Sequence, residues 1–333
     1  MSDVTDRFVE LLERADQPAA IGLVTGLAQQ GAPPEALVLE VLAPAQREVG
    51  RRWEAGRWSI AQEHAATAVT DTALGLLALD AEPNRGGRHA VVGCVEGEWH
   101  SLPARMAAEL LRLRGWHVTF IGGSVPADDL ARYVSAQRPD VVGLSCSMPA
   151  SLKGAARSID ACRRAGVPVL AGGGGFGPEG RYAARLGAWA WAADPLMAAT
   201  LLESGVDRGS PSSVANDANR EEHRALEREK DDIVSTAVAR LEHDDARLRE
   251  ALTFLVTNLE SALFVDDHAV IAACRPATER LLAAGDPATG ATSSALDTLF
   301  GVVQDRFPRA WGLVEESRLV EIEPAVWPHL NRT

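Results

Sequence analysis

The chain has 333 residues, of which 46% are hydrophobic, and this is ample for two or three packed domains. Its formal net charge of −13, with no run rich in Lys and Arg, argues against direct nucleic-acid binding. No signal peptide or bilayer-spanning stretch is evident, and the four cysteines have no paired spacing, so we expect a reduced, cytoplasmic protein without disulfides or structural zinc.

Residues 1–82 have the pattern of four helices. Turn-forming residues interrupt the helical pattern at 15–18, 31–34 and 55–59, and Ser59 is suited to cap the last helix. Apolar residues recur at helical spacing in the third segment, as at Leu37, Val41 and Val49. Short loops between helices of this length predict an antiparallel four-helix bundle.

Residues 86–204 alternate short apolar runs with helical segments. Strands are predicted at 89–95, 117–123, 140–146, 167–173 and 188–193, and helices are predicted to begin near 103, 126, 151 and 179. Continuous apolar strands joined by helical crossovers are typical of a parallel sheet that is covered on both faces. We therefore predict an α/β domain with a five-stranded, doubly wound parallel sheet.

Residues 217–333 follow a Ser-, Gly- and Asn-rich linker and have the pattern of an all-α domain of about five helices. Two apolar stripes at helical spacing support this prediction. They comprise Leu248, Leu252, Leu255, Leu259 and Leu263, and then Leu296, Leu299, Phe300 and Val303.

Polar and small residues follow three of the predicted strands. His100 lies in the loop after the first strand, Ser145 and Ser147 end the third, and Gly172 to Gly175 end the fourth. In an open parallel sheet, ligands bind at the carboxyl ends of the strands. Taken alone, His100 would be a solvated surface residue, but glycines that let a bulky group approach the backbone favour a ligand site.

These residues resemble the cobalamin-binding domain whose signature is Asp-x-His-x-x-Gly, then Ser-x-Leu, then Gly-Gly. The resemblance implies a Rossmann-like, flavodoxin-like fold with His100 as the cobalt ligand and Glu98 as the carboxylate that orients its ring. In this chain Glu98 stands for the Asp, Pro103 for the Gly and Ser147 for the Leu. The cofactor-binding residues that the resemblance implies in this domain are Glu98, Trp99, Ser101, Leu102, Ser145, Ser147, Gly172, Gly173, Gly174 and Gly175.

The bundle carries Trp53, followed after nine residues by Glu63 and His64. On their own these could be a core tryptophan and two solvated helix residues. The spacing resembles the light-sensing adenosylcobalamin repressors, in which such residues surround the upper-face adenosyl group. The resemblance implies that Trp53 packs against adenosyl, that Glu63 hydrogen-bonds it and that residues 1–82 cap the upper face of the cofactor.

Two departures separate the chain from those repressors. The residue after Trp53 is Glu54, where the repressors have a histidine that captures cobalt after photolysis. The sequence opens with the pattern of the bundle, so we also expect no DNA-binding helix-turn-helix ahead of it. We therefore expect a sensor that is not a repressor of that design. Without the capturing histidine, the state formed in light should be less tightly fixed than in the repressors.

A cobalamin photosensor followed by a helical domain resembles the photocobilins, in which a globin-like domain holds biliverdin. A bilin needs an apolar slot, cations for two propionates and polar partners for its pyrrole nitrogens. Each candidate could equally be an ordinary surface or core residue, and a plain dimerisation bundle remains the alternative. The candidates are His243, His268, Cys274 (as an attachment point), Arg275, Arg309 and Trp311.

The sequence thus predicts a non-enzymatic light sensor that binds adenosylcobalamin and biliverdin and changes a homo-oligomeric state in light. Two other classes remain open. One is a corrinoid carrier for a methyltransferase, which would bind methylcobalamin without discrimination. The other is an interaction module whose cobalamin is only a stabilising ligand.

Overall fold

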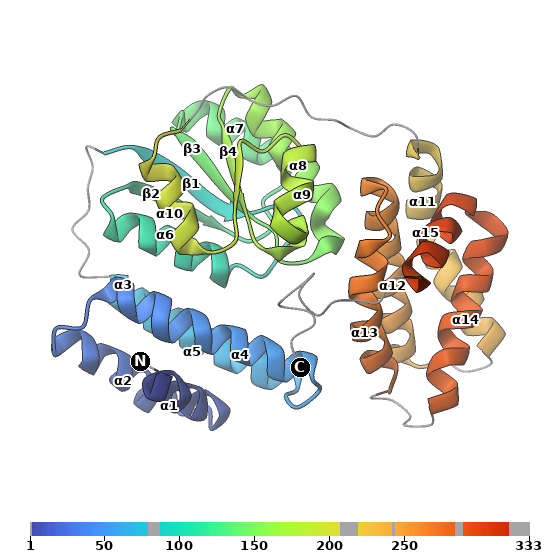
Figure 1. Cartoon of the computed structure of the whole chain (residues 1–333), viewed down its shortest axis with the longest axis horizontal. Coiled ribbons are helices and arrows are strands. Elements are labelled where there is room, and N and C mark those ends of the chain that lie inside the picture. Colours follow the sequence, from blue (N-terminus) through green and yellow to red (C-terminus); the bar gives the residue numbers. More distant parts are fainter. Residues whose placement is uncertain (1, 79–86, 207–218, 242–243, 284–288, 320–333) are drawn as a thin grey trace. The chain divides into compact units, whose positions relative to one another are not determined.

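The computed structural model describes residues 2–78, 87–206, 219–241, 244–283 and 289–319. The chain forms two compact units, Met1–Val214 and Ala215–Thr333. The first unit contains a helical bundle and a parallel sheet (Figure 1), and the second is helical.

The predicted four-helix bundle is confirmed. It consists of α1 (Ser2–Glu13), α2 (Gln17–Gln29), a third helix and α5 (Ile60–Ala78). The third helix has three parts, which are α3 (Pro34–Leu37), a π-helical turn (Val38–Leu42) and α4 (Ala43–Glu54). One apolar cluster fills the bundle, and it includes Phe8, Leu37, Leu42, Trp58 and Leu74.

The π-helical turn has a cause in the sequence. Pro44 has no backbone N–H and its ring conflicts with the carbonyl of Glu40, four residues earlier, in a regular α-helix. The helix widens before Pro44, so that the N–H of Ala43 donates to the oxygen of Val38. The Glu40 carbonyl accepts instead from the hydroxyl of Thr5 on α1, at 2.8 Å.

We expect Thr5→Val to lower the free energy of unfolding by about 1 kcal/mol, because the Glu40 carbonyl loses its donor. In a Pro44→Ala background the same substitution should cost less, since the N–H of residue 44 can then donate to Glu40. Urea unfolding of the four variants measures this coupling. An equal cost in both backgrounds would contradict this role of Thr5.

The predicted five-stranded sheet is also confirmed. Its strands are β1 (His89–Cys94), β2 (His117–Gly122), β3 (Val141–Ser145), β4 (Val169–Gly172) and β5 (Ala190–Ala192). They run parallel in the order β2-β1-β3-β4-β5. Cys94, Ser145 and Gly172 are in register, so these three strand ends lie side by side.

Helices cover the sheet as expected for a doubly wound fold. The helix α6 (Leu102–Leu113) packs with α10 (Pro195–Glu203), and α7 (Ala127–Gln137) packs with α8 (Leu152–Arg164). The short α9 (Arg181–Arg185) contacts β5. The sequence analysis did not predict α10, which follows the last strand.

The bundle and the sheet share a packed boundary along α6. Leu102 and Met106 of α6 belong to the apolar cluster of the bundle. At the far end of α6, the guanidinium of Arg114 pairs with Glu35 of α3 and, at 3.0 Å, with Glu203 of α10. The two layers are therefore held by apolar contacts and by ion pairs.

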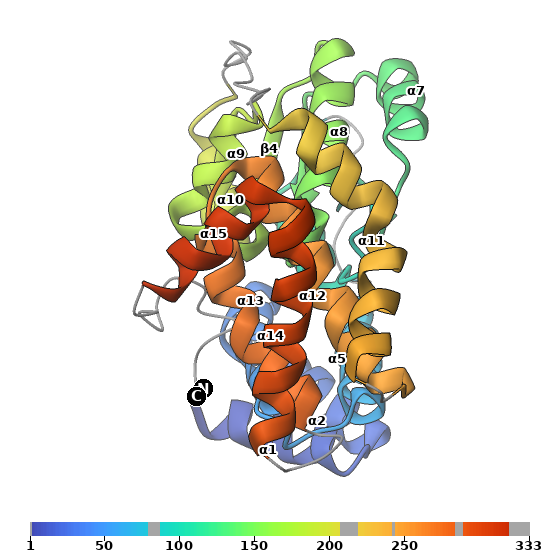
Figure 2. The ribbon, with the colours of Figure 1, turned by 90° about the vertical axis from the view of Figure 1, so that its right-hand side faces the viewer.

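The second unit contains α11 (Arg220–Leu241), α12 (Ala246–Val265), α13 (Ala269–Ala283), α14 (Thr289–Arg306) and α15 (Pro308–Arg318), as Figure 2 shows. Both predicted leucine-rich stripes are buried. The central helix α12 packs against α11, α13 and α15. Among the described residues, no helix is both long and apolar enough to cross a bilayer.

Candidate functional site

The candidate site lies where β1 and β3 are neighbours in the sheet. The chain leaves these two strands toward opposite edges, because β2 lies beyond β1 and β4 lies beyond β3. In open α/β sheets, ligands commonly bind between the two loops that diverge at such a switch point. The loop after β1 carries Glu98 and His100, and the loop after β3 carries Ser147 and Met148.

The carboxylate of Glu98 joins the two loops. Its side chain is only 1% exposed. The oxygen Oε1 accepts from the backbone N–H of His100 at 3.0 Å and lies 2.5 Å from the ring Nδ1 of His100. The oxygen Oε2 accepts from the backbone N–H groups of Ser147 at 2.8 Å and Met148 at 2.9 Å. Both carboxylate oxygens are therefore fully engaged.

These hydrogen bonds set the direction in which the pKa of Glu98 and the pKa of His100 are shifted. Burial alone would raise the pKa of Glu98, but the bonds from His100 and from the backbone lower it below its usual value. The hydrogen bond to Glu98 raises the pKa of His100, against the opposing effect of burial. The charges of Glu98 and of Glu63 add to this increase. An ionised Glu98 at neutral pH follows.

The ring of His100 is presented for ligation. Glu98 occupies Nδ1, which leaves Nε2 as the nitrogen that can coordinate a metal, and the side chain is 57% exposed. Trp99 is exposed, and its ring lies against Gly123, since a Cβ on that glycine would be 3.6 Å from Cε3 of the ring. The loop therefore displays an oriented imidazole beside an indole.

The bundle contributes a second set of residues to this site. Glu63 of α5 lies close enough to His100 for its charge to raise the pKa of the imidazole. Glu63 bonds to the Nδ1 of its neighbour His64, whose side chain is 75% exposed. Trp53 is half-buried and lies outside the apolar cluster of the bundle, where Trp58 is found instead. Trp53 is therefore not the core residue that the alternative interpretation required.

The sequence analysis did not identify Thr67 and Gln46, which form a chain of hydrogen bonds to Glu63. The hydroxyl of Thr67 donates to Oε1 of Glu63 at 2.8 Å, and the amide of Gln46 donates to Thr67 at 2.7 Å. The i, i+4 spacing of Glu63 and Thr67 could have suggested their contact. Nothing in the sequence pointed to Gln46, because it lies on another helix.

The glycines after β4 have a structural reason that the sequence analysis did not give. A Cβ on Gly173 would lie 2.5 Å from the carbonyl oxygen of Cys146, and one on Gly175 would lie 2.6 Å from the Cys146 sulfur. Gly173 also has a φ of 93°, which favours glycine. These two glycines therefore let the protein's own β3 loop approach. Gly172 is more open, with its nearest contact at 3.7 Å.

The other predicted residues of this domain fall into two groups. Ser145 and Ser147 lie at the end of β3, beside Glu98 and Gly172. Ser101 precedes α6, and Leu102 is buried in the apolar cluster of the bundle. Leu102 therefore packs at the boundary between bundle and sheet.

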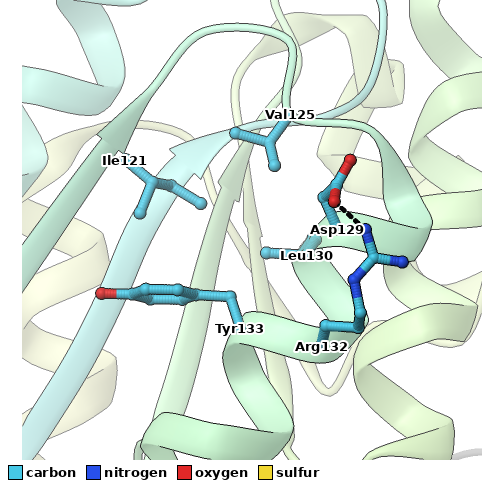
Figure 3. A pocket seen from close by; sticks show the side chains of 6 residues that line it. All are labelled: Ile121, Val125, Asp129, Leu130, Arg132 and Tyr133. Atoms are coloured by element: carbon cyan, nitrogen blue, oxygen red, sulfur yellow. Dashed lines mark hydrogen bonds and ion pairs between the residues drawn. The ribbon is translucent and has the colours of Figure 1, made fainter.

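A cavity of about 450 Å³ lies beside the outer strand β2 (Figure 3). Ile121, Val125, Leu130 and Tyr133 form its apolar lining, and an ion pair between Arg132 and Asp129 lies on its rim. None of these residues belongs to the predicted site.

Two of the bilin candidates in the second unit, His268 and Arg309, pair with the same carboxylate, that of Glu316. Arg309 pairs with Asp266 at 2.8 Å and with Glu316 at 2.6 Å, and His268 lies 3.4 Å from Glu316. The other described candidates lie elsewhere. Arg275 pairs with Glu279, Trp311 lies under the guanidinium of Arg318, and Cys274 is buried. His243 lies outside the described residues.

Comparison with known proteins identifies the first unit. Residues 88–200 match the family profile of the B12 binding domain, and residues 4–78 match a second profile with the same description. The chain contains a cobalamin-binding module.

The repressors CarH and CarA of Myxococcus xanthus, both described as HTH-type transcriptional repressors, are similar to this chain. The identities are 41% over 144 residues and 30% over 136 residues, which cover 42% and 41% of this chain. The matches span 48% and 46% of the two repressors, so the chain covers about half the length of these relatives.

Corrinoid proteins match the same module. Dimethylamine corrinoid protein 3 of Methanosarcina acetivorans is 26% identical over 147 residues, covering 42% of this chain and 69% of that protein. The monomethylamine corrinoid protein of Methanosarcina barkeri superposes with a TM-score of 0.54 at 18% identity. That superposition covers 61% of this chain and 98% of the other, which supports the predicted fold.

The side chains at the switch point fit a cobalamin. Among the described residues, no group of three or more His, Cys, Asp and Glu side chains could hold a bare metal ion. A single imidazole such as that of His100 would suit cobalt that a corrin ring already holds through four nitrogens. The carboxylate on its Nδ1 fixes the tautomer that such ligation needs.

We expect His100→Ala to bind cobalamin more weakly and without an imidazole on the lower face of cobalt. The removal of the ring leaves Oε1 of Glu98 bonded only to the backbone of residue 100, so folding must be checked by circular dichroism. The absorption spectrum of bound cobalamin reports its axial base. A folded variant with the wild-type spectrum would remove His100 from the site.

Cys274 should not react in the native protein. Burial raises the pKa of its thiol to about 12, and the thiol donates to the backbone oxygen of Ile271. We expect iodoacetamide at pH 8 to leave Cys274 unmodified over hours, and to modify it in urea. Rapid native alkylation of Cys274, identified by mass spectrometry, would contradict this and would reopen covalent chromophore attachment.

Proposed function

We propose that this protein is a light sensor whose chromophore is adenosylcobalamin. The observation that carries the proposal is the pairing of Nδ1 of His100 with the buried carboxylate of Glu98, 2.5 Å away, together with the charge of Glu63 on the bundle, which helps to raise the pKa of the imidazole. One carboxylate orients a cobalt ligand. The other lies where a group on the upper face of the cofactor would meet the bundle.

The residues of the bundle suit an upper ligand larger than methyl. Trp53 offers an indole that is outside the core, and Glu63 offers carboxylate oxygens that can accept hydrogen bonds. Adenosylcobalamin supplies a cobalt–carbon bond that visible light breaks, and the adenosyl group carries hydroxyl and amino donors. Loss of that group would remove the partner of Trp53 and Glu63 and change how the bundle docks on α6.

The proposed output is a change of assembly rather than catalysis. The bundle and the sheet meet along α6 through a packed apolar boundary, and packed boundaries switch between discrete arrangements. The −13 charge of the chain favours a protein partner or self-association over direct contact with nucleic acid.

A corrinoid carrier for a methyltransferase is the second candidate, and the similarity to dimethylamine corrinoid protein 3 supports it. A carrier must leave the upper face of cobalt open to a methyl donor. It would therefore bind methylcobalamin as well as adenosylcobalamin, whereas the proposed sensor prefers adenosylcobalamin.

We also propose that the second unit binds biliverdin. The support is the all-helical fold and the grouping of His268 and Arg309, which offer an imidazole and a cation for a propionate. Both groups pair with Glu316, so a bilin would have to displace that carboxylate.

Green light should change the assembly of the protein loaded with adenosylcobalamin. We expect the dark and lit samples to elute differently in size-exclusion chromatography with light scattering. Differential ligand affinity of this kind typically supplies on the order of 1–3 kcal/mol, so the shift should depend on protein concentration. Identical masses at several concentrations would contradict the sensor.

The bilin part has a separate test. The full chain reconstituted with biliverdin should gain a far-red absorption band, and a chain that ends at Val214, the boundary of the first unit, should keep only the cobalamin bands. If the full chain gains no such band, the second unit is an interaction bundle.

A further inference from the structure

Gln46 and Thr67 form a hydrogen-bonded relay behind Glu63, and this relay connects two helices of the bundle. Gln46 lies on α4, whereas Thr67 and Glu63 lie one turn apart on α5. The amide Nε2 of Gln46 is 2.7 Å from the hydroxyl of Thr67, which is 2.8 Å from Oε1 of Glu63. Gln46 also precedes Trp53 by seven residues, or about two helical turns, so the two share one face of the helix.

The chemistry of the groups fixes the direction of the relay. The hydroxyl of Thr67 donates to Oε1 of Glu63, a carboxylate oxygen that accepts. The Thr67 oxygen must then accept, so Gln46 must present its NH₂ group rather than its carbonyl. Donors aligned in sequence polarise one another and strengthen the final bond to the carboxylate.

The orientation of Gln46 carries a cost that indicates a specific role. The amide oxygen Oε1 of Gln46 is buried and has no hydrogen-bond partner in the part of the chain that the structure describes. An unpaired buried acceptor is unfavourable. The amide is nevertheless oriented so that its NH₂ group donates a hydrogen bond to the hydroxyl of Thr67.

The relay leaves Glu63 with little rotational freedom. Thr67 holds Oε1, and His64 lies against Oε2 through its Nδ1. A carboxylate with both oxygens held in this way keeps its remaining lone pairs in a fixed direction. It would then accept from ribose hydroxyls at a defined position, and a methyl group has no such donors.

We propose that Gln46 and Thr67 are positioning residues that set the preference of the site for a nucleoside-bearing upper ligand over methyl. This inference rests on the proposed function, because it assumes that Glu63 meets the upper face of a bound cobalamin. Neither residue needs to touch the ligand. Both act by fixing the carboxylate of Glu63.

The test measures dissociation constants for adenosylcobalamin and methylcobalamin in the dark. Thr67→Val replaces the hydroxyl with a methyl group of similar size, and Gln46→Glu replaces the donor with a carboxylate oxygen. We expect each to lower the preference for adenosylcobalamin about tenfold, or about 1.4 kcal/mol, because a carboxylate that is no longer held in place makes a weaker hydrogen bond to the ligand. Affinity for methylcobalamin should stay the same, because Glu63 has no partner on a methyl group.

Matched controls separate positioning from folding. Thr67→Ser keeps the hydroxyl and should retain the preference. Thr72→Val removes a hydroxyl on the same helix that bonds only to the backbone of Ala68, so it should also retain the preference. In a Glu63→Gln background, Thr67→Val should add no further loss, since its effect passes through Glu63.

Three outcomes would contradict the positioning role of Gln46 and Thr67. If the wild type prefers adenosylcobalamin and folded Thr67→Val and Gln46→Glu keep that preference, the relay is overturned and the sensor stands. If the wild type shows no preference, both the relay and the sensor are overturned. If both cobalamins weaken equally in Thr67→Val but not in Thr67→Ser, the residue only supports the fold and the relay is overturned.

Discussion

The structure of the site depends on the buried carboxylate of Glu98. It accepts from the ring and backbone of His100 and from two backbone N–H groups after β3, and so joins the divergent loops at the switch point. Removing an ionised group from water is costly, and here four hydrogen bonds offset the cost. The same interaction therefore stabilises the loops and orients the imidazole, which explains how an oriented imidazole can lie on a loop.

The remaining architecture places a second carboxylate opposite this one. Leu102 and Met106 follow the loop of His100 directly and pack into the bundle, so the sheet and α5 are held together at the start of α6. Glu63 on α5 is consequently near enough for its charge to raise the pKa of His100. Any change in how the bundle packs on α6 alters the distance between the two carboxylates, and this couples the proposed upper ligand to the boundary between the layers.

The sequence predicted the five strands and the cobalamin-binding domain because both leave local signals. Apolar runs with regular crossovers predicted all five strands, and the spacing around His100 pointed to a cobalamin-binding domain. Other features depend on contacts between distant segments. The bonds from Ser147 and Met148 to Glu98 use backbone groups, which carry no residue signature. Gln46 meets Thr67 across two helices, and Gly173 is a glycine because the backbone of Cys146 passes beside it.

The claim that Glu98 presents His100 as the lower cobalt ligand has a direct spectroscopic test. The protein is produced with ¹⁵N-labelled histidine, loaded with adenosylcobalamin and photolysed without oxygen, and the Co(II) form is measured by electron paramagnetic resonance. We predict that the axial nitrogen splitting changes from three lines in the unlabelled protein to two lines in the labelled one, because imidazole nitrogen would bind cobalt. A three-line pattern that labelling leaves unchanged would show that the cofactor keeps its own base, and would contradict the account.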